Sequence, residues 1–208
     1  MKNRVITISR QFGSGGRELG KRLSDLLGWD YYDKEIIEQL AQESGLDAEY
    51  VRNVLNNHNW HSVPVTYRNT LVSFTLTPSS QTELLKKQRE IIEQIAAVGN
   101  DCIIVGRNAD IILRDYHPFR IFVCADLDSR VKRCLSHETK KNGHQLSESE
   151  IRKGIKKIDR KRVQTRQLLS GTDWKDQSSF DLTVNAGGKN LKILSSAIAE
   201  YALKWFEA

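Results

Sequence analysis

The feature that most constrains this chain is the segment at residues 6–23, ITISRQFGSGGRELGKRL. It runs from a short β-branched strand through a glycine-rich turn into an amphipathic helix. Glycines allow the backbone of such a turn to point its N–H groups inward, and the N-terminus of the helix adds a partial positive charge. This order of elements favours a phosphate-binding turn, although a Gly-Ser-Gly-Gly turn can also be no more than a tight connection.

The residues of this turn depart from the standard P-loop, which reads G-x-x-x-x-G-K-[ST]. If Gly15 is the last glycine of the pattern, Arg10 stands at the first glycine, Gly16 at the lysine and Arg17 at the hydroxyl residue. The shape of the segment therefore fits a P-loop, but its charge has to come from arginines. We expect Arg17 to reach the phosphates in place of the lysine.

The composition is that of one ordinary globular domain, with 208 residues of which 39% are apolar and 28% charged. The net charge of +6 suits anionic partners such as nucleotides, nucleic acid or a membrane surface. No apolar run is long enough to span a membrane, and the apolar segment after residue 4 is too short for a secretory signal. Cys102, Cys124 and Cys134 share no metal-ligand spacing, so we expect free thiols and a cytoplasmic location.

Apolar strands alternate with helices along the chain. The strands are expected at Val5–Ser9, Trp29–Tyr32, Cys102–Val105, Arg120–Cys124 and Leu182–Val184. Helices are expected at 16–27, after Asp33, at 82–98, after Asp126, at 147–170 and at 190–206. This alternation predicts a five-stranded parallel sheet with helices on both faces, a three-layer α/β/α architecture.

Helix ends and helix faces can also be predicted. Gly28 and Gly171 are expected to end the helices that precede them, and Ser147 and Glu150 have the spacing of a capping box. The buried face of the first helix is predicted to consist of four leucines, Leu19, Leu23, Leu26 and Leu27. The segment Ser44–Ser80 is less regular, with a short helix expected at Asp47–Asn56, and is interpreted as an insertion or a mobile subdomain. Its His58 and His61 have no third metal ligand nearby and are interpreted as surface residues.

Phosphoryl transfer needs backbone donors, cations around the moving group and usually magnesium. The candidate cations are Arg10, Arg17, Arg107 and the arginines of the helix at 152–166, because arginine forks suit phosphate oxygens. Arg107 follows a buried strand, at the edge where open α/β sheets bind ligands. Alternatively, Arg107 caps a helix or pairs with Asp110.

Two other groups of charged residues also have alternative interpretations. The basic helix is often only a solvated face, and Asp159 could pair with Arg160 and Arg162 at the surface. Asp33 could do no more than cap the helix that follows it, or it could also contact magnesium or the acceptor. These alternatives remain open at the level of the sequence.

Several motifs taken together resemble the cytidylate kinase-like family, a divergent branch of the P-loop nucleoside monophosphate kinases. They are ISRQFGSGGREL at 8–19, YDKEI at 32–36, IVGRNAD at 104–110, DRKR at 159–162, and GTDWKD at 171–176 with DLTVN at 181–185. The motifs span nearly the whole chain. The resemblance implies a fold of the P-loop NTPase type, an acceptor-binding insertion and a helical lid.

The resemblance also implies an organisation and a set of substrates. Residues 1–208 would form a single domain, with the core at 1–43, 81–138 and 171–208, the insertion at about 44–80 and the lid at about 139–170. ATP and Mg²⁺ would be required, and the acceptor would be CMP or a related nucleoside monophosphate. Asn108 stands where true cytidylate kinases have an aspartate, so the acceptor need not be CMP.

The roles implied by the resemblance fall into four groups. The catalytic candidates are Arg17, Arg107, Arg160 and Arg162. The candidates for binding ATP and its phosphates are Arg10, Gly13, Ser14, Gly15, Gly16, Arg17 and Asn185. The acceptor-binding candidates are Asp33, Lys34, Arg107 and Asn108. The P-loop hydroxyl is absent, so Ser9, Ser14 and Asp33 are the candidates for contacting magnesium.

The first functional hypothesis is therefore an ATP-dependent nucleotide kinase whose catalysis depends on positioning, charge neutralisation and closure of a lid. The alternative is a nucleotide-binding regulatory protein with weak or no kinase activity, which the missing lysine and hydroxyl favour. Binding of nucleic acid through the basic helix is a weaker third hypothesis, because the helix lacks interleaved aromatic residues and any known recognition motif. The expected partners are nucleotides, and neither a membrane nor an oligomeric state is predicted.

Overall fold

The computed structural model describes residues 3–34, 36–37, 78–137, 147–174 and 176–208. The expected insertion at 44–80 lies outside the described residues up to residue 77, and His58 and His61 lie outside them as well. The first part of the expected lid, residues 139–146, is also outside them.

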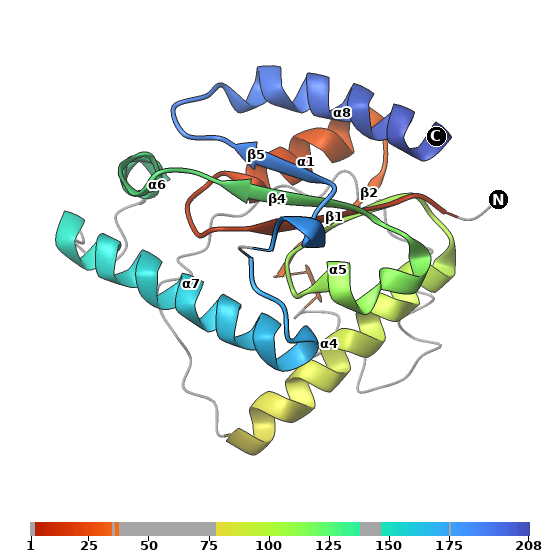
Figure 1. Cartoon of the computed structure of the whole chain (residues 1–208), viewed down its shortest axis with the longest axis horizontal. Coiled ribbons are helices and arrows are strands. Elements are labelled where there is room, and N and C mark those ends of the chain that lie inside the picture. Colours follow the sequence, from red (N-terminus) through yellow and green to blue (C-terminus); the bar gives the residue numbers. More distant parts are fainter. Residues whose placement is uncertain (1–2, 35, 38–77, 138–146, 175) are drawn as a thin grey trace.

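Within the described residues, five parallel strands form one sheet in the order β2-β3-β1-β4-β5 (Figure 1). The strands are β1 (Val5–Arg10), β2 (Asp30–Tyr32), β3 (Cys102–Val105), β4 (Phe119–Cys124) and β5 (Leu182–Asn185). The first strand is central, and its Ile6 is in register with Ile103 of β3 and Phe119 of β4. The predicted five-stranded parallel sheet is confirmed.

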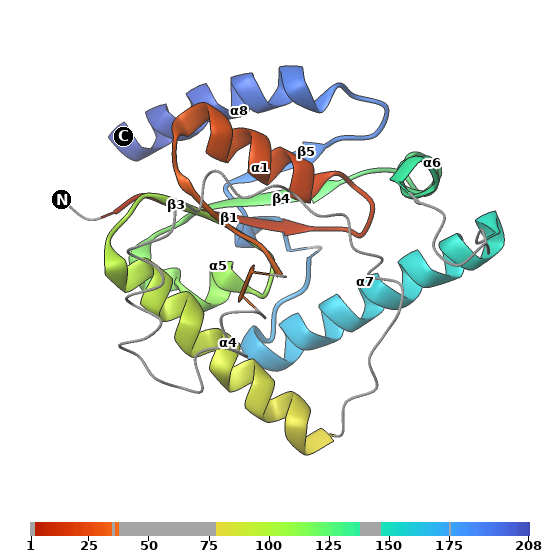
Figure 2. The same ribbon diagram turned by 180° about the vertical axis from the view of Figure 1, so that it is seen from behind.

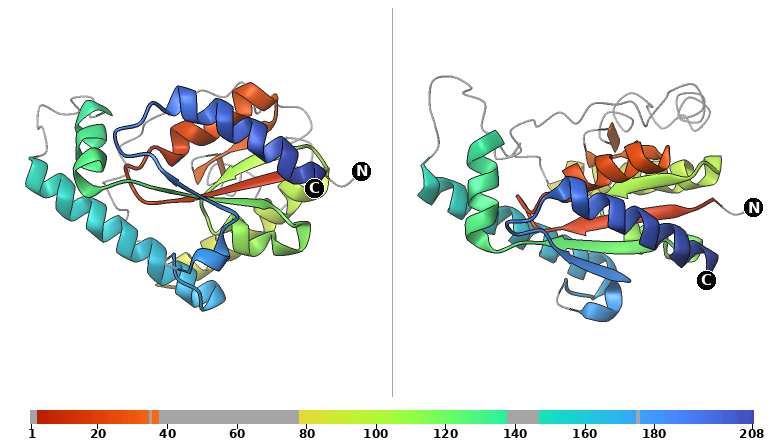
Figure 3. Two further views of the ribbon diagram at one scale, coloured as in Figure 1. Left: turned by 45° about the horizontal axis from the view of Figure 1, so that its top comes forward. Right: turned by 90° about the horizontal axis from the view of Figure 1, so that it is seen from above.

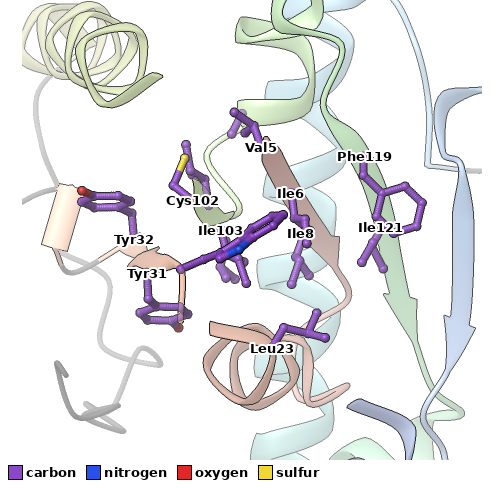
Figure 4. Close-up of a cluster of buried hydrophobic side chains, with 14 of the residues drawn as sticks. Val5, Ile6, Ile8, Leu23, Tyr31, Tyr32, Cys102, Ile103, Phe119 and Ile121 are labelled. Atoms are coloured by element: carbon purple, nitrogen blue, oxygen red, sulfur yellow. The ribbon is translucent and has the colours of Figure 1, made fainter. Parts of the chain in front are cut away.

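The central strands are buried on both faces, as their continuous apolar sequences predict. Ile6, Ile8 and Ile103 are almost fully buried. Figure 4 shows Leu23 of α1 (Gly16–Leu27) next to Ile8, with Ile121 on the neighbouring strand β4. Each such side chain contributes about 1.5–3 kcal/mol through burial, so this core holds β1 rigidly in the middle of the sheet.

Helices cover both faces of the sheet (Figures 1 and 2). The helices α1 and α8 (Leu191–Glu207) lie on one face. The helices α4 (Pro78–Val98), α5 (Ala109–Ile112) and α7 (Glu148–Ser170) lie on the other. Short 3-10 helices occupy Arg114–Tyr116 and Gln177–Ser179. This is the predicted three-layer α/β/α architecture.

The carboxyl ends of the strands gather at one end of the molecule. Figure 3 shows β1 running from the end that holds both termini toward the end that holds α6 (Leu127–His137). From there β1 continues into α1 on one face, whereas β3 continues into α5 on the other (Figure 1). Adjacent strands whose connections leave on opposite faces mark the place where open α/β sheets bind ligands.

The predicted helix ends are confirmed in detail. Ser147 and Glu150 form a complete capping box at the start of α7, and Gly28 and Gly171 end α1 and α7 in the left-handed conformation. One prediction is wrong, because Leu26 is 53% exposed. The buried stripe of α1 consists of Gly16, Leu19, Gly20, Leu23 and Ser24, and Leu26 lies outside it.

In the part of the chain that the structure describes, no helix combines the length and the apolar character needed to cross a membrane. Cys102 is a buried free thiol, and Cys124 and Cys134 are free and half-buried.

Candidate active site

The glycine turn between β1 and α1 leaves several backbone N–H groups without a partner. Gly13 and Gly15 have φ angles of 75° and 92°, which only glycine adopts readily. In the described part of the chain, the N–H groups of Gly13, Gly15 and Gly16 make no hydrogen bond to the protein. N–H groups without a protein partner at the start of a helix suit an anion, so the turn has donors that a phosphate could use.

The carbonyl groups of the same turn are held from outside. Arg130 and Arg133, one turn apart on α6, donate to the carbonyls of Phe12 at 3.2 Å and Gly13 at 3.3 Å. The Ser14 hydroxyl donates a hydrogen bond to the Gln11 carbonyl at 2.9 Å. These hydrogen bonds satisfy the carbonyl groups of the turn, whereas the N–H groups of Gly13, Gly15 and Gly16 make no hydrogen bond within the described residues.

Helix α7 is fastened to the turn through Asp159. Its carboxylate accepts a hydrogen bond from the Phe12 N–H at 2.7 Å and pairs with Arg130 at 2.5 Å. Asp159 is 4.0 Å from Arg162, which donates to the Arg10 carbonyl at 3.0 Å. The alternative that Asp159 only pairs at the surface is therefore wrong, because this carboxylate joins α6, α7 and the turn.

Four arginines, Arg10, Arg17, Arg107 and Arg162, lie close enough to repel one another. Desolvation holds the pKa of Arg10 well below its ordinary value, and the charges of Arg162, Arg17 and Arg107 lower it further. Desolvation lowers the pKa of Arg162 to about 10, with Asp159 opposing the shift and Arg107 and Arg17 adding to it. This concentration of positive charge favours binding of a polyanion.

Arg17 and Asp33 form a pair on the β2 side of this cluster. Arg17 Nε is 3.3 Å from Asp33 Oδ2, and the Tyr31 hydroxyl donates to the same oxygen at 3.3 Å. The other oxygen of Asp33 accepts the Ile36 N–H at 3.3 Å, so the predicted helix-capping role is confirmed. Asp33 is buried, and it orients Arg17.

The loop after β3 has an unusual backbone. Gly106, Arg107 and Asn108 have φ angles of 84°, 56° and 53°. Consecutive left-handed residues that are not glycine are strained, and such strain tends to occur at functional sites. Gly106 also lies directly beneath the guanidinium of Arg10: a Cβ atom built on Gly106 would be 1.5 Å from Arg10 Nη1. This loop therefore meets the glycine turn through Arg10.

A buried ion pair anchors the C-terminal half of α7. Arg166 Nη1 is 2.6 Å from Asp110 Oδ2, and both side chains are at most 3% exposed. The Ser9 hydroxyl donates to the other oxygen of Asp110 at 3.3 Å. Arg166 also lies over the ring of Phe180 at 5.0 Å. Asp110 pairs with Arg166 and not with Arg107, so the alternative of an Arg107–Asp110 pair is wrong.

The remaining candidates are spread more widely. Arg160 lies on the exposed face of α7. Asn185 ends the edge strand β5, and its side chain accepts the Gly187 N–H at 3.1 Å. Lys34 directly follows β2, and Asn108 is the N-cap residue of α5. The structure therefore gathers Arg10, Arg17, Arg107, Arg162 and the glycine turn, whereas Arg160 and Asn185 lie apart from one another on separate elements.

The described residues do not reproduce the P-loop magnesium site. Arg17 occupies the position of the hydroxyl ligand, and Ser14 is fully buried with its hydroxyl bonded to the Gln11 carbonyl. The Ser9 hydroxyl is bonded to Asp110, and Asp33 is paired with Arg17. No group of three or more His, Cys, Asp or Glu side chains in the described residues has the geometry to hold a metal ion.

Reasoning from the sequence missed the two arginines of α6. Arg130 and Arg133 hold the turn from outside, yet they occur in an ordinary amphipathic helix. Their spacing of three residues places them on one helix face, and this was the only available signal.

The order of the strands, the glycine turn that follows the central strand and the cationic cluster define the fold of a P-loop kinase. The shikimate kinase from Bacteroides thetaiotaomicron shares it with a TM-score of 0.53 and 12% identity over 99% of each chain. The shikimate kinase from Acinetobacter baumannii in complex with shikimate has a TM-score of 0.54 and 10% identity over 97% of this chain and 94% of that one. Likeness at such low identity shows the fold alone.

A structure of an uncharacterized protein from Eubacterium ventriosum ATCC 27560 is more similar, with a TM-score of 0.70 and 21% identity over 96% of this chain and 98% of that one. No curated protein matches the sequence. The model of the cytidylate kinase-like family matches residues 5–187. The chain belongs to the cytidylate kinase-like family, and its family and fold together support a kinase for a nucleotide or another small molecule.

Proposed function

We propose that this protein transfers the γ-phosphoryl group of ATP to CMP or a related nucleoside monophosphate. In this reaction the bond between the γ-phosphorus and its bridging oxygen breaks, and ADP leaves with the electron pair. An oxygen of the acceptor phosphate forms the new bond to phosphorus. The principal work of the protein is to position the two nucleotides and to neutralise the charge between them.

One observation carries this proposal. Arg10, Arg17, Arg107 and Arg162 converge beside the unpartnered N–H groups of the glycine turn. The N–H groups suit the phosphates of ATP, and arginine forks suit the oxygens of the group in transfer. Arg107 follows β3, and Arg17 pairs with Asp33, which follows β2. The acceptor phosphate would lie on this side of the site, with Asp33, Lys34 and Asn108 as further residues that bind the acceptor.

We propose that α7 acts as the lid. Its Arg162 and Asp159 contact the strand and turn at Arg10 and Phe12. In this proposal the core comprises 1–43, 81–138 and 171–208, the lid spans about 139–170, and the insertion at about 44–80 binds the acceptor. Arg160 would join the site only if the lid moved, and Asn185 would lie near the base of ATP.

Magnesium would enter with ATP. Because no hydroxyl stands at the P-loop position and Asp33 is paired, phosphate oxygens and water would supply most of its ligands. ATP is abundant in the reducing cytoplasm, where the three free cysteines would persist, and we propose that location.

The test is phosphoryl transfer from γ-labelled ATP with magnesium, using a panel of nucleoside monophosphates and small hydroxylated metabolites such as shikimate. We expect labelled nucleoside diphosphate with CMP or a close relative. Transfer to a metabolite alone would retain the kinase and overturn the nucleotide acceptor. ATP binding without transfer to any acceptor would overturn the kinase proposal.

The second candidate function is that of a nucleotide-binding regulatory protein with little activity. It predicts ATP binding without transfer to any acceptor. One observation favours this candidate: Gly16 stands at the position of the P-loop lysine, and Arg17 stands at the position of the hydroxyl residue. The two candidates share the phosphate site and differ only in turnover.

A further inference from the structure

Arg10 and Gly16 are in contact across the turn. Relative to the P-loop pattern, Arg10 replaces a glycine and Gly16 replaces the lysine. In the structure, a Cβ atom built on Gly16 would be 2.8 Å from the Cβ of Arg10 and 3.1 Å from its Cγ. These two of the three departures from the pattern therefore face each other, although they are six positions apart in the sequence.

The backbone of Gly16 does not itself require glycine. Gly16 begins α1 and is not among the residues with a positive φ angle, so an ordinary side chain is compatible with its conformation. What excludes a side chain is the stem of Arg10. Conversely, a glycine at position 10 would leave this space empty. The stem of Arg10 thus accounts for the glycine at position 16, and the absence of a side chain at Gly16 leaves room for that stem.

The head of Arg10 is also positioned by a glycine. Its guanidinium lies over Gly106, the residue that directly follows β3. Among the described residues, Arg10 has no carboxylate partner, and the charges that act on it most are those of Arg162, Arg17 and Arg107. Arg17, by contrast, is paired with Asp33 on the β2 side.

We propose that Arg10, and not Arg17, carries the charge of the missing P-loop lysine. The cation reaches the terminal phosphates of a nucleoside triphosphate from the strand side of the turn instead of the helix side. The arginine at position 10 and the glycine at position 16 are a reciprocal exchange of the glycine and lysine of the standard loop. This inference rests on the proposed nucleotide-phosphate site.

The exchange can be reversed in the full-length chain. Arg10→Gly removes the cation, Gly16→Lys adds one against the stem of Arg10, and the double variant restores the standard pattern at both positions. The readouts are ATP and AMP affinity by calorimetry and the midpoint of thermal unfolding. Arg114→Gly is the charge-matched control, because Arg114 is 80% exposed in the 3-10 helix at Arg114–Tyr116.

We expect Arg10→Gly to weaken ATP binding about 10- to 100-fold, the range for a lost charged hydrogen bond, and to change AMP binding much less. Gly16→Lys should lower the unfolding midpoint without strengthening ATP binding. The double variant should recover both the midpoint and most of the ATP affinity, so that the two changes are strongly non-additive. Arg10→Met, which retains a stem over Gly16, should weaken ATP binding as Arg10→Gly does.

Unchanged ATP affinity in Arg10→Met, or a double variant no better than Arg10→Gly, would overturn the inference while leaving the proposed function in place. A wild-type chain that binds no ATP would overturn the proposed function and the inference with it. Equal losses in Arg114→Gly would show that the effect is only one of net charge, which also contradicts the inference.

Discussion

The guanidinium of Arg10 lies against the backbone of Gly106, with Nη1 only 1.5 Å from the position a Cβ atom on Gly106 would take. This contact joins the end of β1 to the end of β3, and it places a cation with no carboxylate partner among the described residues between the glycine turn and the strained loop at Arg107. Desolvation and neighbouring arginines lower the pKa of Arg10, so its charge destabilises the folded, ligand-free protein.

Arg10→Met should therefore stabilise the ligand-free protein. An arginine whose pKa is lower in the folded than in the unfolded chain imposes its full cost below the folded pKa, and neutral pH lies there. Removing the charge should raise the free energy of unfolding, and each kcal/mol gained would raise the Tm of a chain of this size by roughly 2–4 °C. Thermal unfolding without phosphate ions measures this change. A lower Tm would mean that Arg10 is a structural residue.

The contribution of the Arg107 side chain can be measured separately from the effect of its strained backbone. Arg107→Ala and Arg107→Gly both remove the guanidinium, but only glycine adopts the φ angle of 56° without strain. We expect both variants to lose phosphoryl transfer, with Arg107→Gly more stable than Arg107→Ala by about 1 kcal/mol. Equal stabilities in chemical denaturation would contradict the strain, and full activity in either variant would remove Arg107 from the site.

Asp110→Ala should be strongly destabilising. It leaves Arg166 buried without its partner, and breaking a buried pair in this way costs about 3–5 kcal/mol. The double variant Asp110→Leu with Arg166→Met removes both charges and should recover most of the loss. Urea unfolding of the wild type, Asp110→Ala and the double variant measures the free energy of unfolding of each. A decrease of less than about 1 kcal/mol for Asp110→Ala would show that the pair does not anchor α7.

The affinity for ATP should fall at alkaline pH, because Arg162 loses its charge there. Its pKa of about 10 means that the guanidinium is charged at neutral pH and loses its proton as the pH rises through about 10. ATP affinity should therefore be constant between about pH 8 and 9 and fall above that range. Arg162→Gln should bind more weakly at pH 8 and show a smaller decline. An affinity that is flat to pH 11 in the wild type would exclude Arg162 from the phosphate site.

The architecture could be predicted because each element has its own local signal. The β-branched strand at Val5, the glycine turn and the capping box at Ser147 and Glu150 depend only on neighbouring residues. The boundaries were less accurate for a physical reason. Helix α4 begins at Pro78 and not at 82, because proline is tolerated in the first turn of a helix although it breaks the pattern.

The candidate site was predicted only in outline. The convergence of Arg10, Arg107 and Arg162 followed from the positions of their motifs, but the exchange between Arg10 and Gly16 required coordinates. The clamp formed by Arg130 and Asp159 on Phe12 depends on how α6 and α7 dock against the turn, over separations of more than a hundred residues. No local period encodes such a contact.

The most direct test of the account is a calorimetric comparison of ATP and adenosine binding to the full-length chain. If the glycine turn and the arginine cluster form a triphosphate site, ATP should bind at least about a hundredfold more tightly than adenosine, and its affinity should fall as salt is added. Similar affinities for ATP and adenosine, or ATP binding indifferent to salt, would contradict the central claim that this turn binds phosphate.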